Sequence, residues 1–326
     1  MKRLLTTHRT LAVLTCVLTA LLLLSSCVAP EPATPDLIVG FSQLGAESGW
    51  RIGNTRDVAS AAERAGIQLM MLNAEQMQEN QIKAIRSFIA YQVDVITLAP
   101  IVEQGWETVL LEAKAAGIPV LLIDRDISVS DGSLYAGSIG SDFLEEGRRA
   151  GLFLKERTRD KDSVRIVEIT GTPNSTPTRE RTLGFVGTLG DDPRYQITMT
   201  VSGDFLRSKG RECMENILSL TRGIDVLYSH NDAMTLGAIE AIEAVGLKPG
   251  KDIIIITVDG EQGAIDLLKQ GKINCVVECN PMIGDQIMGL VKKLAAGEDI
   301  PRKTYTTERV FSEWDDDLQS IPPRGY

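Results

Sequence analysis

The residues best suited to chemistry are charged and amide side chains that directly follow short apolar runs. Asp124 and Arg125 end the run PVLLI, Asp259 ends IIIITV, and Asn231 follows VLYS after one histidine. Hydrogen bonds to charged partners contribute roughly 1.5–3 kcal/mol each. No nucleophile-base pair accompanies these groups, so the set suits binding of a neutral, polyhydroxylated ligand. A structural link between two lobes is the alternative role for Asp124 and Arg125.

A second group of candidates follows the first apolar run, LIVGFS at 37–42. It offers the amide of Gln43, the carboxylate of Glu47, the indole of Trp50 and the guanidinium of Arg51. The glycines of this loop lack the G-x-G-x-x-G spacing, so a dinucleotide fingerprint is absent. An aromatic face can cover the apolar C–H side of a sugar ring. Taken alone, however, Trp50 fits a core position at a helix start better than a ligand contact.

Further candidates in the second half each have a structural alternative. Arg179 lies nearest a strand end, whereas Arg181 could belong to a solvated helix face. Phe205 could be a plain core residue, and Asp232 could cap a helix. Glu278 follows the run INCVV and is a further candidate for ligand binding.

Alternating strands and helices must position these residues. Apolar runs predict strands at 37–42, 67–72, 94–99, 118–124, 164–169, 195–201, 224–229, 252–258, 273–278 and near 304–311. Helical patterns occupy 50–65, 105–116, 142–157, 178–189, 207–220, 232–245, 261–270 and 282–296, and another contains Ile82, Ile85, Phe88 and Ile89. Continuous apolar runs indicate parallel sheets covered on both faces. This number of strands is larger than one twisted open sheet usually contains. We therefore expect an α/β fold with two doubly wound, Rossmann-like lobes joined by a hinge. Ligands of such sheets bind outside the carboxyl ends of the strands.

Composition excludes several classes of function. The 326 residues include 34 Lys and Arg against 44 Asp and Glu, a net charge of −10. An acidic chain without a basic block is a poor nucleic-acid binder, because that affinity depends on phosphate neutralisation. Only His8 and His230 occur, which excludes a multi-histidine metal site and makes a Ser-His-Asp triad improbable. We expect no cofactor, no metal and no disulfide framework.

The first residues predict export and a lipid anchor. Lys2, Arg3 and Arg9 precede the apolar run 11–24, which is shorter than the roughly 20 residues of a membrane-spanning helix. This pattern is typical of a signal peptide, here residues 1–26. The run Leu24-Ser25-Ser26-Cys27 resembles a bacterial lipobox, in which Cys27 would carry the lipid, and 27–35 would form a proline-rich tether. An uncleaved anchor helix is the alternative.

Several segments together resemble the periplasmic sugar-binding proteins of ABC transporters, in the ribose/galactose-type cluster. The resemblance covers essentially all of 36–326. Its markers are IPVLLIDR (118–125), TRERTLGF (178–185), SGDFLRSKG (202–210), SHNDAMTLGAIEAI (229–242) and VDG (258–260). Within the cluster, the chain is most similar to the galactofuranose-binding members. That likeness depends on GFSQLGAESGWR (40–51), QENQIKAIRSFIA (78–90) and GLKPGKDI (246–253).

The resemblance implies a type I periplasmic binding protein fold with discontinuous lobes, 36–140 plus 281–309 and 141–280 plus 310–326. It implies that Asp124, Arg125, Arg179, Phe205, Asn231 and Asp259 line a sugar site, with sub-family contacts from Glu47, Trp50 and Arg51. Glu278-Cys279-Asn280 stands where ribose-type members place a site glutamine, which leaves that contact open. The calcium loop of glucose/galactose members is missing, so again no metal is expected.

The function implied is capture of a monosaccharide, galactofuranose-like or related, by hinged closure. The partners implied are the sugar, an ABC permease and the membrane that holds the lipid anchor, with the body itself monomeric and periplasmic or on the outer membrane face. The sequence has three alternative interpretations. A repressor effector domain would need a helix-turn-helix before residue 36, where the signal segment lies. A glycoside-processing enzyme could use Asp124 and Asp259 as paired carboxylates. A receptor that signals to a chemoreceptor or sensor kinase would use the same binding body.

Overall fold

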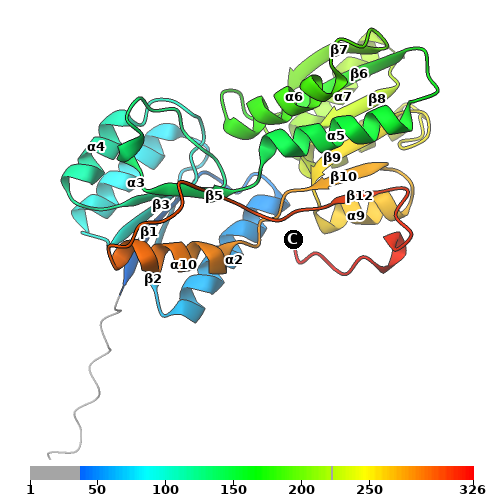
Figure 1. The fold of residues 1–326 in the computed structure, drawn as a ribbon. Helices are drawn as coiled ribbons and strands as arrows, with labels where there is room; N and C mark the ends of the chain where they lie inside the picture. The colour runs from blue at the N-terminus through cyan, green and yellow to red at the C-terminus, as the bar shows by residue number, and fades with distance from the viewer. Residues whose placement is uncertain (1–36, 222) are drawn as a thin grey trace, which may run out of the picture. The chain divides into compact units, whose positions relative to one another are not determined.

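The computed structural model of the chain describes residues 37–221 and 223–326 (Figure 1). Within these ranges, no helix has both the length and the apolar character needed to cross a membrane. The predicted signal peptide, 1–26, and the predicted lipidation site, Cys27, lie outside the described residues.

The first sheet contains six parallel strands in the order β11-β5-β4-β3-β1-β2. Its strands are β1 (Ile38–Gln43), β2 (Gln68–Asn73), β3 (Val95–Leu98), β4 (Val120–Ile123), β5 (Gly137–Gly140) and β11 (Lys303–Tyr305). Its helices are α2 (Gly49–Ala65), α3 (Gln78–Ala90), α4 (Glu107–Ala115) and α10 (Gly284–Ala295). One apolar core joins the sheet to α2 and α10, and another joins it to α3 and α4. Two covered faces explain why β3 and β4 are buried along their whole length.

The second sheet also contains six strands, in the order β12-β10-β9-β8-β6-β7. Its strands are β6 (Val164–Thr170), β7 (Tyr195–Ser202), β8 (Val226–Ser229), β9 (Ile254–Asp259), β10 (Cys275–Glu278) and β12 (Val310–Ser312). Its helices are α5 (Phe143–Arg157), α6 (Thr176–Leu189), α7 (Arg207–Leu220), α8 (Asp232–Ala244) and α9 (Gln262–Lys269). The core on one face contains α5 and α6, and the core on the other contains α7, α8 and α9. The expected α/β fold with two doubly wound sheets is confirmed.

The chain passes between the two sheets at three places. It leaves the first sheet after β5 and enters α5, it leaves the second after β10 and returns through α10, and it crosses again between β11 and β12 (Figure 1). The lobe boundaries expected from the sequence fall at these connections. Which residues move together as one lobe stays a prediction.

Two expectations about strands were wrong. The single strand expected near 304–311 is two short strands in different sheets, and β12 runs antiparallel to β10. Strand β5 was not predicted at all, because GSIG holds one apolar residue, Ile139, among small ones and so gives no apolar run. Close backbone packing requires those small residues. A Cβ at Gly137 would lie 2.5 Å from the Pro301 carbonyl oxygen, and one at Gly140 would lie 2.4 Å from that of Asp124.

Candidate ligand-binding site

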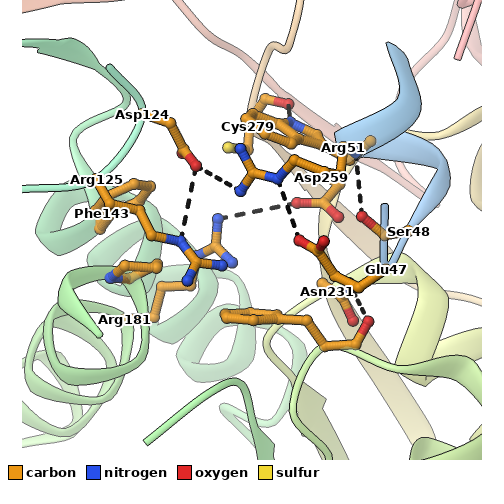
Figure 2. A pocket seen from close by; sticks show the side chains of 13 residues that line it. Glu47, Ser48, Arg51, Asp124, Arg125, Phe143, Arg181, Asn231, Asp259 and Cys279 are labelled. Carbon is orange, nitrogen blue, oxygen red and sulfur yellow. Dashed lines mark hydrogen bonds and ion pairs between the residues drawn. The ribbon is translucent and has the colours of Figure 1, made fainter. Parts of the chain in front are cut away.

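A pocket with an empty volume of about 300 Å³ lies at the carboxyl ends of strands from both sheets, and its side chains point toward one another in Figure 2. The predicted candidates that line it are Glu47, Trp50, Arg51, Asp124, Arg125, Phe205, Asn231 and Asp259. Glu47 precedes helix α2, Trp50 and Arg51 are in the first turn of α2, and Asp124 and Arg125 follow β4. Phe205 and Asn231 follow β7 and β8, and Asp259 is the last residue of β9.

Arg51 is the centre of a buried charge cluster on the first-sheet side. Its Nη2 donates to Asp124 Oδ2 at 2.6 Å and its Nε to Glu47 Oε1 at 3.1 Å (Figure 2). Ser48 begins helix α2 as its N-cap and accepts from the Arg51 backbone N–H, which fixes the helix start beside the pocket. Burial lowers the pKa of Arg51, but the two carboxylates more than offset this, so the net shift is upward. Gln43 accepts from Arg51 Nη1 at 3.3 Å and lies behind it, outside the pocket lining.

Asp124 and Arg125 form a tight turn at the end of β4. Asp124 has φ 65°, a left-handed conformation that aspartate tolerates better than most residues. Arg125 Nη1 donates to the Ile101 carbonyl at 3.2 Å, and its guanidinium lies 5.1 Å from the Phe205 ring centre. Burial, with the nearby charge of Arg51, lowers the pKa of Arg125 to about 10, so it stays charged at neutral pH.

Arg181 has the corresponding position on the second-sheet side. Its Nε donates to Glu146 Oε2 at 2.7 Å, its Nη1 donates to the His230 carbonyl, and its Nη2 lies 3.9 Å from Asp259 Oδ1. Burial raises the pKa of Asp259 well above its ordinary value, although Arg181 opposes the shift. Burial likewise raises the pKa of Glu146 to about 8, again against the effect of Arg181.

Asn231 joins the pocket to the start of α8. Its Oδ1 accepts from the Met234 backbone N–H at 2.9 Å, so Asn231 is the N-cap of α8. Its Nδ2 donates to the Phe205 carbonyl at 3.3 Å. The alternative that Asp232 caps this helix was therefore wrong. Asp232 instead accepts from the Gly260 backbone N–H at 2.7 Å and holds the turn after β9.

Two other predicted candidates lie outside the pocket. The Arg179 side chain is 50% exposed and pairs with Glu103 at 3.0 Å. Two residues along a helix are about 200° apart, so Arg179 and Arg181 face opposite directions, and Arg181 is the one that lines this pocket. A ligand contact of Arg179 stays a prediction. Glu278 is also absent from the lining, because its Oε2 accepts from the Arg309 backbone N–H at 2.9 Å.

Sequence reasoning missed several lining residues, namely Ser48, Phe143, Pro177, Arg181 and Cys279. A signal for Arg181 was present. It lies four residues before Phe185, a fully buried core residue, and residues four apart share a helix face. The interpretation of Arg181 as a solvated residue ignored this spacing. Cys279 belongs to the segment Glu278-Cys279-Asn280, whose contact the resemblance left open, whereas Ser48, Phe143 and Pro177 carried no comparable signal.

The pocket is lined by equal numbers of basic and acidic side chains, and it contains buried polar atoms that make no hydrogen bond to residues 37–221 or 223–326. Three guanidinium groups and three carboxyl groups line it. Within the described part of the chain, Glu47 Oε2 and Arg125 Nε are buried and make no hydrogen bond. One is an acceptor and the other a donor, as a hydroxyl group requires. The arrangement can therefore bind a polar ligand whose groups both donate and accept hydrogen bonds.

One cluster beside the pocket has the composition of a cation site. Atoms of Glu146, Cys279 and Glu308 lie within 4.8 Å of one another. Arg181 already pairs with Glu146, and burial raises the pKa of the Cys279 thiol well above its ordinary value. The guanidinium of Arg181 takes the place of a cation beside Glu146, and the raised pKa keeps a proton on the thiol, so both effects disfavour a metal ion in this cluster.

Comparison with known proteins places the chain in a family. Residues 39–299 match the family described as periplasmic binding protein domain. The galactofuranose-binding protein YtfQ of Escherichia coli (strain K12) is 40% identical over 287 residues, which are 87% of this chain and 90% of that protein.

Solved structures agree. A protein from Mycobacterium smegmatis in complex with β-D-fucofuranose is 45% identical with a TM-score of 0.85, over 87% of this chain and 93% of that one. The periplasmic binding component of the arabinose ABC transporter of Shewanella sp. ANA-3, bound to α- and β-L-arabinofuranose, is 42% identical with a TM-score of 0.83 over the same shares. YtfQ and the arabinose transporter component are binding proteins, so the glycoside-processing alternative is rejected. The resemblance inferred from the sequence is confirmed: the chain belongs to the periplasmic binding protein family, and with it to the exported substrate-binding proteins rather than the enzymes.

Proposed function

We propose that this protein captures a monosaccharide in its furanose form between the two sheets and delivers it to the permease of an ABC transporter. The observation that carries the proposal is the pocket itself. It receives charged side chains from both sheets. One acceptor, Glu47 Oε2, and one donor, Arg125 Nε, make no hydrogen bond there with any described residue, and Arg125 Nε lies 3.7 Å from Asp124 Oδ2. The ligands named for the relatives, galactofuranose, fucofuranose and arabinofuranose, support a five-membered ring.

Each side chain has a role that follows from its chemistry. We assign Asp124 and Asp259 as acceptors for ring hydroxyls, because both are buried and approach the pocket from opposite sheets. Arg125 donates to a sugar oxygen through its Nε, which makes no hydrogen bond within the part of the protein that the structure describes. The rings of Trp50 and Phe205 cover apolar C–H faces of the sugar. Arg51 orients Asp124 and Glu47, and Gln43 orients Arg51.

Capture occurs by closure of the two lobes, 36–140 plus 281–309 against 141–280 plus 310–326. Contacts between residues of the two sheets support a closed form. The Glu103 backbone N–H donates to the Asn174 carbonyl at 2.9 Å, and Thr176 Oγ1 donates to the Asp126 carbonyl at 2.9 Å. The body acts as a monomer on a lipid anchor at Cys27, outside the described residues. That anchor places the open site beside a permease.

Ring-locked sugars test the proposal. We would titrate the protein by calorimetry with 1,4-anhydro-D-galactitol, which has a furanose ring, and with 1,5-anhydro-D-galactitol, which has a pyranose ring. A thermal-shift screen of pentoses and hexoses would run in parallel, because ligand at 100 times its Kd stabilises by about 2.7 kcal/mol. The proposal predicts that the furanose analogue binds at least about tenfold more tightly, a difference of about 1.4 kcal/mol. Equal binding of both rings would refute the furanose assignment, and no shift with any sugar would refute sugar capture.

A further inference from the structure

The start of helix α2 is capped by a side chain from the other lobe, at a position between β9 and α9. The first N–H groups of a helix have no acceptor within the helix. Ser48 accepts only from the Arg51 N–H, so Gly49 and Trp50 need another acceptor. The Trp50 N–H donates to Glu261 Oε1 at 2.8 Å. The backbone of Gly49, like that of Trp50, acts to lower the pKa of this carboxyl group, against the larger effect of burial. Glu261 precedes α9 in the second sheet, 211 residues farther along the chain.

Gly49 makes this close approach possible. A Cβ atom at Gly49 would lie 2.6 Å from Glu261 Oε2 and 2.9 Å from its Cδ. The backbone of Gly49 does not have positive φ, so its own conformation does not require glycine. Alanine is the better helix former by roughly 1 kcal/mol at interior positions. Glycine at position 49 therefore leaves the space that the Glu261 carboxylate occupies.

Glu261 contributes little to its own half of the molecule. It stands at the N-cap of α9, but its side chain makes no capping bond there. Its backbone N–H is held by Asp232 Oδ2 at 2.7 Å, on the turn where Asp259 has φ 122° and Gly260 has φ 95°. The side chain is 8% exposed and is directed to α2.

We propose that Glu261 is a latch between the lobes, which stabilises the closed form by capping α2 and so slows release of the bound sugar. The inference rests on the proposed function, because closure on a sugar is what the latch would hold. Pocket and latch share backbone on both sides: Asp259 lies two residues before Glu261, and the latched residue Trp50 lines the pocket together with Arg51. A carboxylate at a helix N-terminus is favoured by the N–H groups and by the helix dipole. Glu261 therefore acts as a positioning residue that does not touch the sugar.

Two variants remove the latch by different routes, and each has a matched control. Glu261→Ala removes the carboxylate, and Gly49→Ala blocks its approach. The controls are Glu79→Ala, an exposed acid in the first turn of α3, and Gly289→Ala, in α10 with open space around its Cβ position. Loss of one or two charge-assisted bonds, partly replaced by water, should weaken sugar affinity roughly 5- to 30-fold.

The test combines stopped-flow and calorimetric titration with L-arabinose and D-galactose, both of which contain a furanose fraction in solution, with hydrogen exchange of the segment 44–56. Both latch variants should release sugar faster and weaken binding, whereas both controls should match wild type. Amides of Gly49 and Trp50 should exchange several-fold faster in Glu261→Ala. Wild-type affinity and release rate in both latch variants would overturn the proposal. If wild type binds neither sugar, the proposed ligand class fails, and the exchange rates alone decide the latch: equal rates in wild type and Glu261→Ala overturn it.

Discussion

Replacing Asp124 with Asn should separate a ligand-binding role of this residue from a structural one. The change keeps the shape of the side chain and the tolerance for positive φ, which matters because φ is 65° at this position. It removes the charge that Arg51 Nη2 contacts at 2.6 Å and leaves Arg51 with Glu47 as its remaining carboxylate partner. It also turns one of two acceptor oxygens into a donor, so a sugar hydroxyl loses its partner.

Two losses add up in this variant. Weakening a buried pair without replacing it costs folding stability, and the asparagine amide recovers part of that cost, which leaves about 1–3 kcal/mol. Loss of the hydroxyl contact should cost a further 2–4 kcal/mol or so of binding free energy, roughly 30- to 1000-fold in Kd. The effect on affinity should therefore be larger than the effect on stability.

The assay pairs calorimetric titration of the bound sugar with urea unfolding of the sugar-free protein. Asp126→Asn is the control, since Asp126 lies in the same loop, pairs with Lys303 at 2.6 Å, and does not line the pocket. That partly exposed pair should contribute at most about 1 kcal/mol. If Asp124→Asn lost stability but kept wild-type affinity, Asp124 would be a structural strand-end residue, and the assignment of the site would be refuted.

Three further predictions follow from particular contacts. Arg181→Gln should weaken sugar binding by more than about 30-fold, because Arg181 lines the pocket. Arg179→Gln on the same helix should change it by less than about fivefold, because its half-exposed ion pair with Glu103 contributes at most about 1 kcal/mol; calorimetry showing the reverse order would contradict the site. Burial raises the pKa of Glu146 from its ordinary 4.5 to about 8, so in that range the folded protein holds a proton that the unfolded chain has released. The free energy of unfolding should therefore fall as pH rises through this window, and Glu146→Gln should flatten the slope; parallel urea curves for the two proteins at acidic and basic pH would argue against it. Expressed in a bacterium, wild type should partition with membranes and Cys27→Ser should not be lipidated; wild type that retains residues 1–26 would exclude the anchor.

The fold was largely readable from the sequence because buried parallel strands leave continuous apolar runs. Runs such as PVLLI and IIIITV correspond to β4 and β9, and the carboxylates that follow them, Asp124 and Asp259, both line the pocket. Strand β5 was not readable, since its glycines are selected by close backbone packing and not by hydrophobicity.

Site residues at strand ends could be predicted from the sequence. Those whose position depends on the rotation of a helix or on contacts between the two lobes could not. Arg179 was preferred over Arg181 by distance along the chain, although the helix turns one toward solvent and the other toward the pocket. Glu261 gave no local signal, because its partner, the start of α2, lies 211 residues earlier. Glu278 follows the same strand-end rule as Asp259, yet bonds to the β12 side of the molecule.

A crystal structure of the protein grown with L-arabinose tests the central claim most directly. The account predicts a furanose ring in the pocket, with hydroxyl groups bonded to both Asp124 and Asp259 and a ring face against Trp50 or Phe205. A pyranose ring in that position, or a sugar that contacts residues of only one sheet, would contradict it.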